Sequence, residues 1–171
     1  MSSLTVHVQA IILTGFAGLM AVAAFEDFRR LIIPNLLTIA LCGLWPFYVA
    51  TTAPSLEGIA AALGCAVIVF VAGALLFARG LLGGGDVKLL SAAVLWAGPA
   101  ATPKLLMLTC VLGGVLALFM LIPVGRQLAA AGRMLLGQPP MMNERGLSIS
   151  VPYGIAIAGA AIFVMFPSAP V

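Results

Sequence analysis

Charged residues are scarce in this chain of 171 residues. Lys, Arg, Asp and Glu together make up 8% of it and 63% is hydrophobic, whereas an ordinary soluble domain has about 25% charged residues. This scarcity excludes a soluble globular domain and indicates an integral membrane protein. The formal net charge of +3 comes from eight basic and five acidic residues. Charges this few and dispersed give no reason to expect a nucleic acid partner.

Histidine and cysteine are nearly absent, which excludes several kinds of active site. His7 is the only histidine, so a Ser-His or Cys-His nucleophile system and a multi-histidine metal site are not expected. The three cysteines, Cys42, Cys65 and Cys110, lie far apart in apolar runs and form no CxxC pair. We interpret them as small buried hydrophobic side chains and expect neither a metal nor a cofactor. Hydrolysis by this chain would have to use carboxylates.

Apolar runs separated by polar breaks predict an all-α membrane domain with about six transmembrane helices. The expected spans are 4–25, 34–52, 58–78, 87–101, 104–124 and 149–166, and residues 1–171 form a single domain. The fourth span is short and contains Gly98-Pro99, so it needs tilt, local thinning of the bilayer or burial among its neighbours.

Between the last two spans, residues 125–148 form the longest polar loop. Within it, 126–136 is expected to form a short helix at the membrane interface, with its arginines near the lipid headgroups. We interpret this helix as a surface element, and a substrate-docking element is the alternative.

Basic residues gather in alternate loops. Seven of the eight are Arg29, Arg30, Arg79, Lys88, Arg126, Arg133 and Arg145, and only Lys104 lies in the opposite loops, with Glu57. The positive-inside rule therefore predicts that the seven face the cytoplasm and that both termini lie outside. Asp27 follows the first span and Asp86 follows the third, so both are expected on the cytoplasmic face.

These two aspartates are the candidate catalytic pair. Two carboxylates can hydrolyse a peptide bond if the ionised one activates water and the protonated one polarises the carbonyl. Two carboxylates in close contact cannot easily both ionise, so a shared proton is the expected resting state. Each aspartate also has a purely structural interpretation: Asp86 as the N-cap of the fourth span, and Asp27 as the ion-pair partner of Arg30.

Three glycines, Gly83, Gly84 and Gly85, directly precede Asp86. Glycine allows another chain to approach the backbone closely. Asn35 follows Pro34 in the first turn of the second span, where its amide can bind a substrate backbone or steady a carboxylate. The alternative for Asn35 is an ordinary polar residue at the start of a helix.

Together these segments carry a family resemblance. Gly83-Gly84-Gly85-Asp86 fits the GxGD pattern of membrane aspartyl proteases. The chain also contains Asp27-Phe28-Arg29-Arg30-Leu31-Ile32-Ile33-Pro34-Asn35 after the first span, Asp86-Val87-Lys88-Leu89 after the glycines, and Val151-Pro152-Tyr153-Gly154 at the last span. In order and spacing, essentially the whole chain resembles the type IV prepilin peptidases, and most of all the short members that serve Flp/Tad-type pili.

The resemblance implies a six-span peptidase of the bacterial inner membrane that removes the short basic leader of prepilins at the cytoplasmic boundary. Asp27 and Asp86 match the two catalytic aspartates of the family. The implied substrate-positioning residues are Gly83, Gly84, Gly85, Asn35, Lys88, Pro152, Tyr153 and Gly154. The implied partners are a prepilin and the lipid bilayer, with the oligomeric state left open. Longer members also methylate the new N-terminus through a region with paired cysteines, and because this chain has no CxxC we expect cleavage without methylation.

Two other functions remain open at this stage. An ion-coupled transporter also uses intramembrane acids and broken helices, but the chain has no visible inverted repeat and its acids lie at one boundary. A non-catalytic assembly subunit for a pilus or secretion system would use the glycines only for close helix packing.

Overall fold

A computed structural model describes residues 3–138 and 151–166 of the chain. In this part of the chain every regular element is a helix: α1 Ser3–Arg30, α2 Asn35–Thr52, α3 Leu56–Ala78, α4 Gly84–Leu121, α5 Pro123–Leu135 and α6 Tyr153–Met165. The predicted all-α fold is therefore confirmed. The predicted start of the last span at residue 149, the second half of the 125–148 loop and Arg145 lie outside the described residues.

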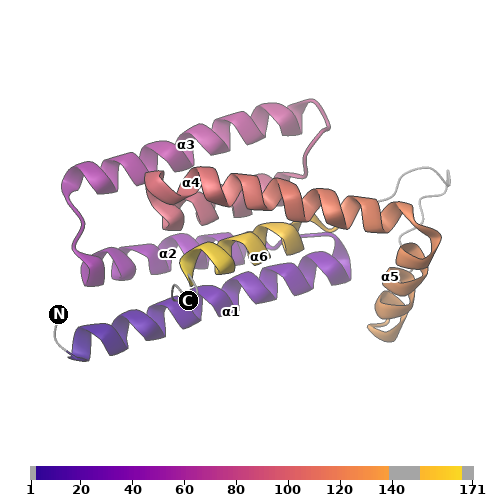
Figure 1. The fold of residues 1–171 in the computed structure, drawn as a ribbon, viewed down its shortest axis with the longest axis horizontal. Helices are drawn as coiled ribbons and strands as arrows, with labels where there is room; N and C mark the ends of the chain where they lie inside the picture. The colour runs from indigo at the N-terminus through magenta and orange to yellow at the C-terminus, as the bar shows by residue number, and fades with distance from the viewer. Residues whose placement is uncertain (1–2, 139–150, 167–171) are drawn as a thin grey trace.

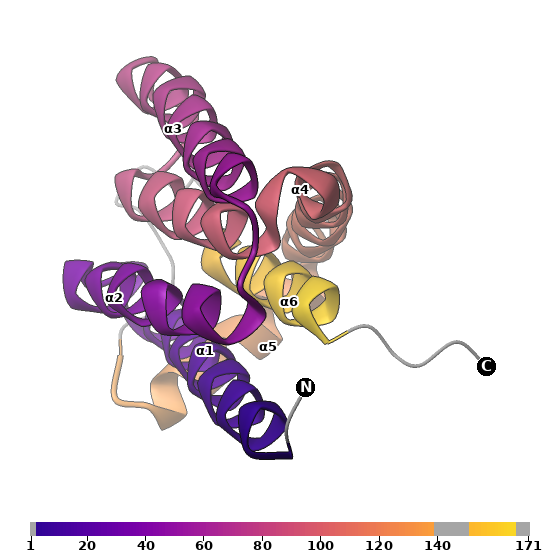
Figure 2. The same ribbon diagram turned by 90° about the vertical axis from the view of Figure 1, so that its left-hand side faces the viewer.

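Four of the helices, α1 to α4, are long and apolar enough to cross a membrane. They pack as a bundle in which α2 contacts α1 and α4, and α3 contacts α4 (Figure 1). The shorter α6 lies between α1 and α4, as Figure 2 shows. The α1–α2 and α3–α4 connections and the start of α6 lie at the same end of the bundle, where α5 also leaves α4.

The helix α4 consists of two limbs that meet at Gly98. This residue has a φ of 67° and a ψ of 177°, outside the helical region, and Pro99 follows it. The sequence predicted two separate spans, 87–101 and 104–124. The structure confirms two helical segments, but they divide at Gly98 instead of at 102–103, and the first begins three residues earlier. This first limb is short. Six consecutive residues within it, from Ser91 to Trp96, are all buried. Burial among neighbouring helices thus allows a limb shorter than an ordinary span.

Trp96 fixes the centre of the bundle. Its indole Nε1–H donates to the backbone carbonyl of Leu41 in α2 at 3.0 Å. Its ring lies 4.5 Å from that of Phe16 in α1 and 5.2 Å from that of Tyr48 in α2, measured between ring centroids. A buried indole that both packs and donates a hydrogen bond ties α1, α2 and α4 together.

The outer surface carries many apolar side chains, including Leu36, Phe47 and Val67, as expected of helices that face lipid. Cys42 and Cys110 lie on this surface and Cys65 is half-buried, and all three are free thiols. The prediction that the cysteines are buried was therefore wrong for Cys42 and Cys110. Lipid tails are as apolar as a protein interior, so an apolar run does not indicate which of its side chains face inward.

Candidate active site

Asp27 and Asp86 lie at the same end of the bundle. Asp27 is in the last turn of α1 and Asp86 in the first turn of α4. The two carboxylates are near enough to interact electrostatically. Asp27 is only 5% exposed, and an ionised carboxylate at such depth is costly unless its environment offers partners. Asp27 has a backbone N–H as its hydrogen-bond partner, and Asp86 has the backbone of Gly83 beside it.

The partner of Asp27 comes from α6, which is far away in the sequence. The Gly154 N–H donates to Asp27 Oδ2 at 2.6 Å. Gly154 is in the first turn of α6, where backbone N–H groups have no partner within the helix and the helix dipole favours negative charge. The site has no room for a side chain at this residue, because a Cβ on Gly154 would lie 2.8 Å from the same Oδ2. Gly154 thus both binds and encloses the Asp27 carboxylate.

The first turn of α6 is in turn seated on the second limb of α4. A Cβ on Gly113 would lie 2.5 Å from ring atoms of Tyr153, so Gly113 provides the space that the Tyr153 ring occupies. The preceding Pro152 is fully buried. The sequence interpretation selected Pro152, Tyr153 and Gly154 but missed Gly113, because nothing in the sequence distinguishes it from other glycines of apolar helices.

The partner of Asp86 is the residue that begins its own helix. Gly83 is the N-cap of α4, which makes Asp86 the third helical residue, and the Gly83 backbone lies beside the Asp86 carboxylate. An acidic side chain at this position that reaches back to the N-cap is half of a capping box. The alternative that Asp86 is itself the N-cap was wrong. A Cβ on Gly83 would lie 2.7 Å from Asp86 Oδ2, so this glycine also leaves room for the carboxylate.

The other two glycines of the motif face side chains of the same chain. A Cβ on Gly84 would lie 3.3 Å from the Phe77 ring at the end of α3, and a Cβ on Gly85 would lie 3.1 Å from Cβ of Ile33 in the α1–α2 connection. These glycines let α3 and the α1–α2 connection pack closely against the start of α4. The close contacts at Gly84 and Gly85 are therefore made by other segments of this chain.

Asn35 and Lys88 contact each other across the start of α2 and the first limb of α4. The Lys88 Nζ donates to Asn35 Oδ1 at 3.0 Å. Lys88 also lines a cavity of about 290 Å³ between α2, α3 and that limb. The cavity lining is otherwise mostly apolar and consists of Thr38, Cys42, Leu63, Ala66, Val67, Phe70, Ser91, Ala92 and Leu95. Its α4 residues lie on the face of the helix opposite Asp86, because Lys88 follows Asp86 by about half a helical turn.

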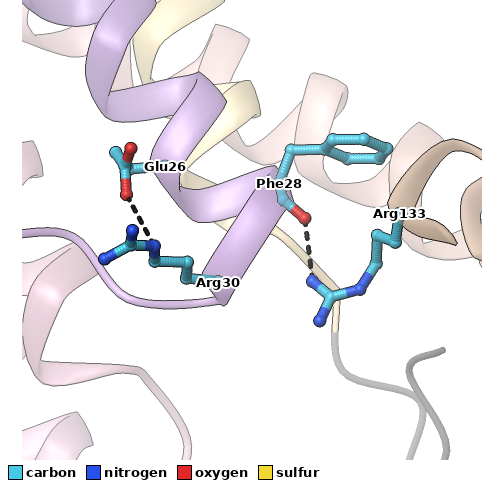
Figure 3. A network of polar contacts seen from close by, with 4 residues as sticks. All are labelled: Glu26, Phe28, Arg30 and Arg133. Atoms are coloured by element: carbon cyan, nitrogen blue, oxygen red, sulfur yellow. Dashed lines mark hydrogen bonds and ion pairs between the residues drawn. The ribbon is translucent and has the colours of Figure 1, made fainter. Parts of the chain in front are cut away.

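Two cations near Asp27, Arg30 and Arg133, have other partners (Figure 3). Arg30 Nε lies 3.4 Å from Glu26 Oε2, one turn earlier on α1, so the alternative that Asp27 is the ion-pair partner of Arg30 was wrong. Arg133 of α5 donates from Nη1 to the backbone carbonyl of Phe28 at 2.8 Å and is 5% exposed. The predicted helix around 126–136 is present as α5, but the expectation that its arginines lie near the headgroups was wrong for Arg133.

The described residues contain no group of three or more His, Cys, Asp or Glu side chains that could hold a metal ion. What the described residues do bring together is an α-helical bundle with two carboxylates at one end, Asp27 buried and hydrogen-bonded by a backbone N–H and Asp86 half-buried. Such a pair can exchange a proton between its members and act on a water molecule between them.

The chain belongs to the Type IV leader peptidase family, whose family model matches residues 14–118. It is therefore a member of a family of proteases that are built into membranes. The matched residues include Asp27, the three glycines and Asp86, whereas α5 and α6 lie beyond them. No match was found among curated proteins or among solved structures.

Proposed function

We propose that this protein is an aspartic-type endopeptidase that cleaves the short basic leader from type IV or Flp-type prepilins. The single observation that carries the proposal is the pair Asp27 and Asp86, which two helices bring to the same end of the bundle, near enough to interact electrostatically. Membership in the Type IV leader peptidase family supports the same substrate class.

In the proposed reaction, one aspartate is ionised and the other carries the proton. The ionised carboxylate takes a proton from water, and the water oxygen attacks the scissile carbonyl, whose oxygen accepts a hydrogen bond from the protonated carboxyl. When the tetrahedral intermediate collapses, the leaving amine receives a proton from the pair. Because the cycle needs one proton on two carboxylates, we expect the rate to fall at low pH, where both are protonated, and at high pH, where both are ionised.

The mostly apolar cavity between α2, α3 and the first limb of α4 supports a substrate with an apolar helix. A prepilin would lie against α2, α3 and the first limb of α4 through its hydrophobic segment, with the scissile bond at the end of the bundle where water and the aspartates meet. Its basic leader would lie near Glu26 and the two aspartates. In this proposal the site faces the cytoplasm from the inner membrane, the new N-terminus is not methylated, and no cofactor is needed.

The proposal is tested by changing each aspartate to its neutral isostere. We expect Asp27→Asn and Asp86→Asn each to abolish processing of a co-expressed Flp-type prepilin, while both variants insert and accumulate as the wild type does. Full cleavage by either variant would contradict the proposal. Ion-dependent flux in liposomes that a prepilin peptide does not affect would favour a transporter instead.

A further inference from the structure

We propose that Arg133 is a positioning residue that holds the end of α1 and thereby the carboxylate of Asp27. The inference deepens the proposed function, since it rests on Asp27 being one of the two reacting groups. It is carried by the contact between α5 and the last turn of α1, which Figure 3 shows.

The last turn of α1 needs a partner from elsewhere in the chain. The final four carbonyls of an α-helix have no intrahelical N–H to accept. The carbonyl of Asp27 accepts from the Leu31 N–H at 2.8 Å. Leu31 itself has a φ of 55°, a left-handed conformation that a leucine rarely adopts and that persists only where surrounding contacts hold it. The next carbonyl, that of Phe28, accepts from Arg133 at 2.8 Å.

The guanidinium of Arg133 suits this position. It is buried at the negative end of the α1 dipole, where a cation that binds the last carbonyls is stabilising. Phe28 is the residue directly after Asp27, so the hydrogen bond fixes the backbone next to the carboxylate. The Phe28 ring is held as well, because a Cβ on the adjacent Gly132 would lie 3.2 Å from its Cζ.

The rest of α5 keeps Arg133 in place. Its inner face consists of Gly125, Ala129 and Arg133, spaced four residues apart and all buried. At Gly125 a Cβ would collide with the backbone carbonyl of Phe119, at the end of α4. The start of α5 is therefore packed closely on α4, and two helical turns later Arg133 reaches α1. In this way α5 connects the second limb of α4 to the turn that carries Asp27.

The first test compares Arg133→Met with wild type in steady-state cleavage of an Flp-type prepilin by the protein in liposomes. We expect kcat to fall about 10- to 100-fold, because a displacement of about 1 Å in a reacting group can cost that much, and KM to stay close to that of wild type. Arg133→Lys retains a positive charge and N–H donors, so its kcat should lie between that of Arg133→Met and that of the wild type. Arg126→Met, on the exposed side of α5, is the matched control, and its kcat should equal that of the wild type.

The second test leaves Arg133 unchanged. Gly132→Val should press on the Phe28 ring and lower kcat in the same way, whereas Ala131→Val, at an exposed neighbouring residue, should not. Hydrogen exchange gives a measurement that does not depend on activity: in Arg133→Met, backbone amides at the end of α1, including Leu31 N–H, should exchange faster than in wild type. If Arg133 stabilised only α5, exchange would increase in α5 alone.

The outcomes separate this inference from the proposed function. A wild type that cleaves no prepilin would overturn the proposed function, and the exchange experiment would still decide whether Arg133 holds the end of α1. A wild type that cleaves, together with Arg133→Met that has the wild-type kcat and unchanged exchange at the end of α1, would overturn the role of Arg133.

Discussion

Gly154 is the residue on which the geometry of Asp27 depends most. Its N–H binds the carboxylate at 2.6 Å, and its missing side chain leaves the space that the carboxylate occupies. Both effects follow from one residue in the first turn of α6. A carboxylate that accepts a backbone hydrogen bond at a helix N-terminus is held in one orientation, which is what a reacting group in a buried site requires.

We therefore expect Gly154→Ala to lower the rate of leader cleavage about 100-fold, since its Cβ would displace the Asp27 carboxylate. The measurement is kcat on a prepilin, normalised to the amount of folded protein in the membrane. Gly159→Ala is the control on the same helix, because its Cβ would meet only a Leu112 methyl at the ordinary distance of 3.6 Å. Equal kcat for the two variants would show that Gly154 does not position Asp27.

At the scale of elements, the contact between α4 and α6 determines where the first turn of α6 lies. Tyr153 fits against Gly113 with no space for a further atom. The chain offers a neighbouring comparison, because a Cβ on Gly114 would have nothing within 4 Å. The two adjacent glycines thus differ only in what faces them.

We expect Gly113→Ala to destabilise the folded protein by about 1–3 kcal/mol through overpacking, which exceeds the gain of up to about 1 kcal/mol from replacing a helical glycine by alanine. Gly114→Ala should be neutral or slightly stabilising for the same reason. Thermal unfolding in detergent measures the stability of both variants, and cleavage activity is followed in parallel. A Gly113→Ala variant as stable and active as Gly114→Ala would mean that Tyr153 is not seated as described.

The cavity between α2, α3 and the first limb of α4 can be examined through the native cysteines. Cys42 lines it, whereas Cys110 is exposed on the other limb of α4 and does not. In a Cys65→Ser background, a prepilin with single cysteines placed along its apolar helix should cross-link to Cys42 and not to Cys110. Cross-linking to Cys110 alone, or to both equally, would show that the substrate helix approaches by another route.

The sequence indicated the helices because a bilayer requires about 20 apolar residues per span. It placed Gly98-Pro99 inside the span 87–101, whereas the break in α4 lies at Gly98. It did not indicate which faces turn inward: Cys42 and Cys110 are exposed, and Arg133 is buried. Inside a bilayer both lipid and protein are apolar, so hydropathy carries little information about burial.

The sequence could predict those residues of the candidate site whose types are rare in this chain. Asp27 and Asp86 are two of only five acidic residues, and the loop pattern indicated that they lie at one end. The contributions of Gly113 and Arg133 depend on contacts between helices that are distant in sequence, and a common glycine and a loop arginine give no local signal of them. The same holds for Gly85, which packs against Ile33.

At the scale of the whole molecule, the bundle brings the end of α1, the start of α4 and the start of α6 to one place. The central claim is that the two carboxylates gathered there hydrolyse a prepilin. The most direct test is the mass of a purified Flp-type prepilin before and after incubation with the purified protein in liposomes containing a chelator. We predict one cut that releases the basic leader and leaves an unmethylated mature chain with wild type, and no cut with Asp27→Asn or Asp86→Asn. An intact prepilin with wild type, or a cut that survives loss of either aspartate, would contradict the claim.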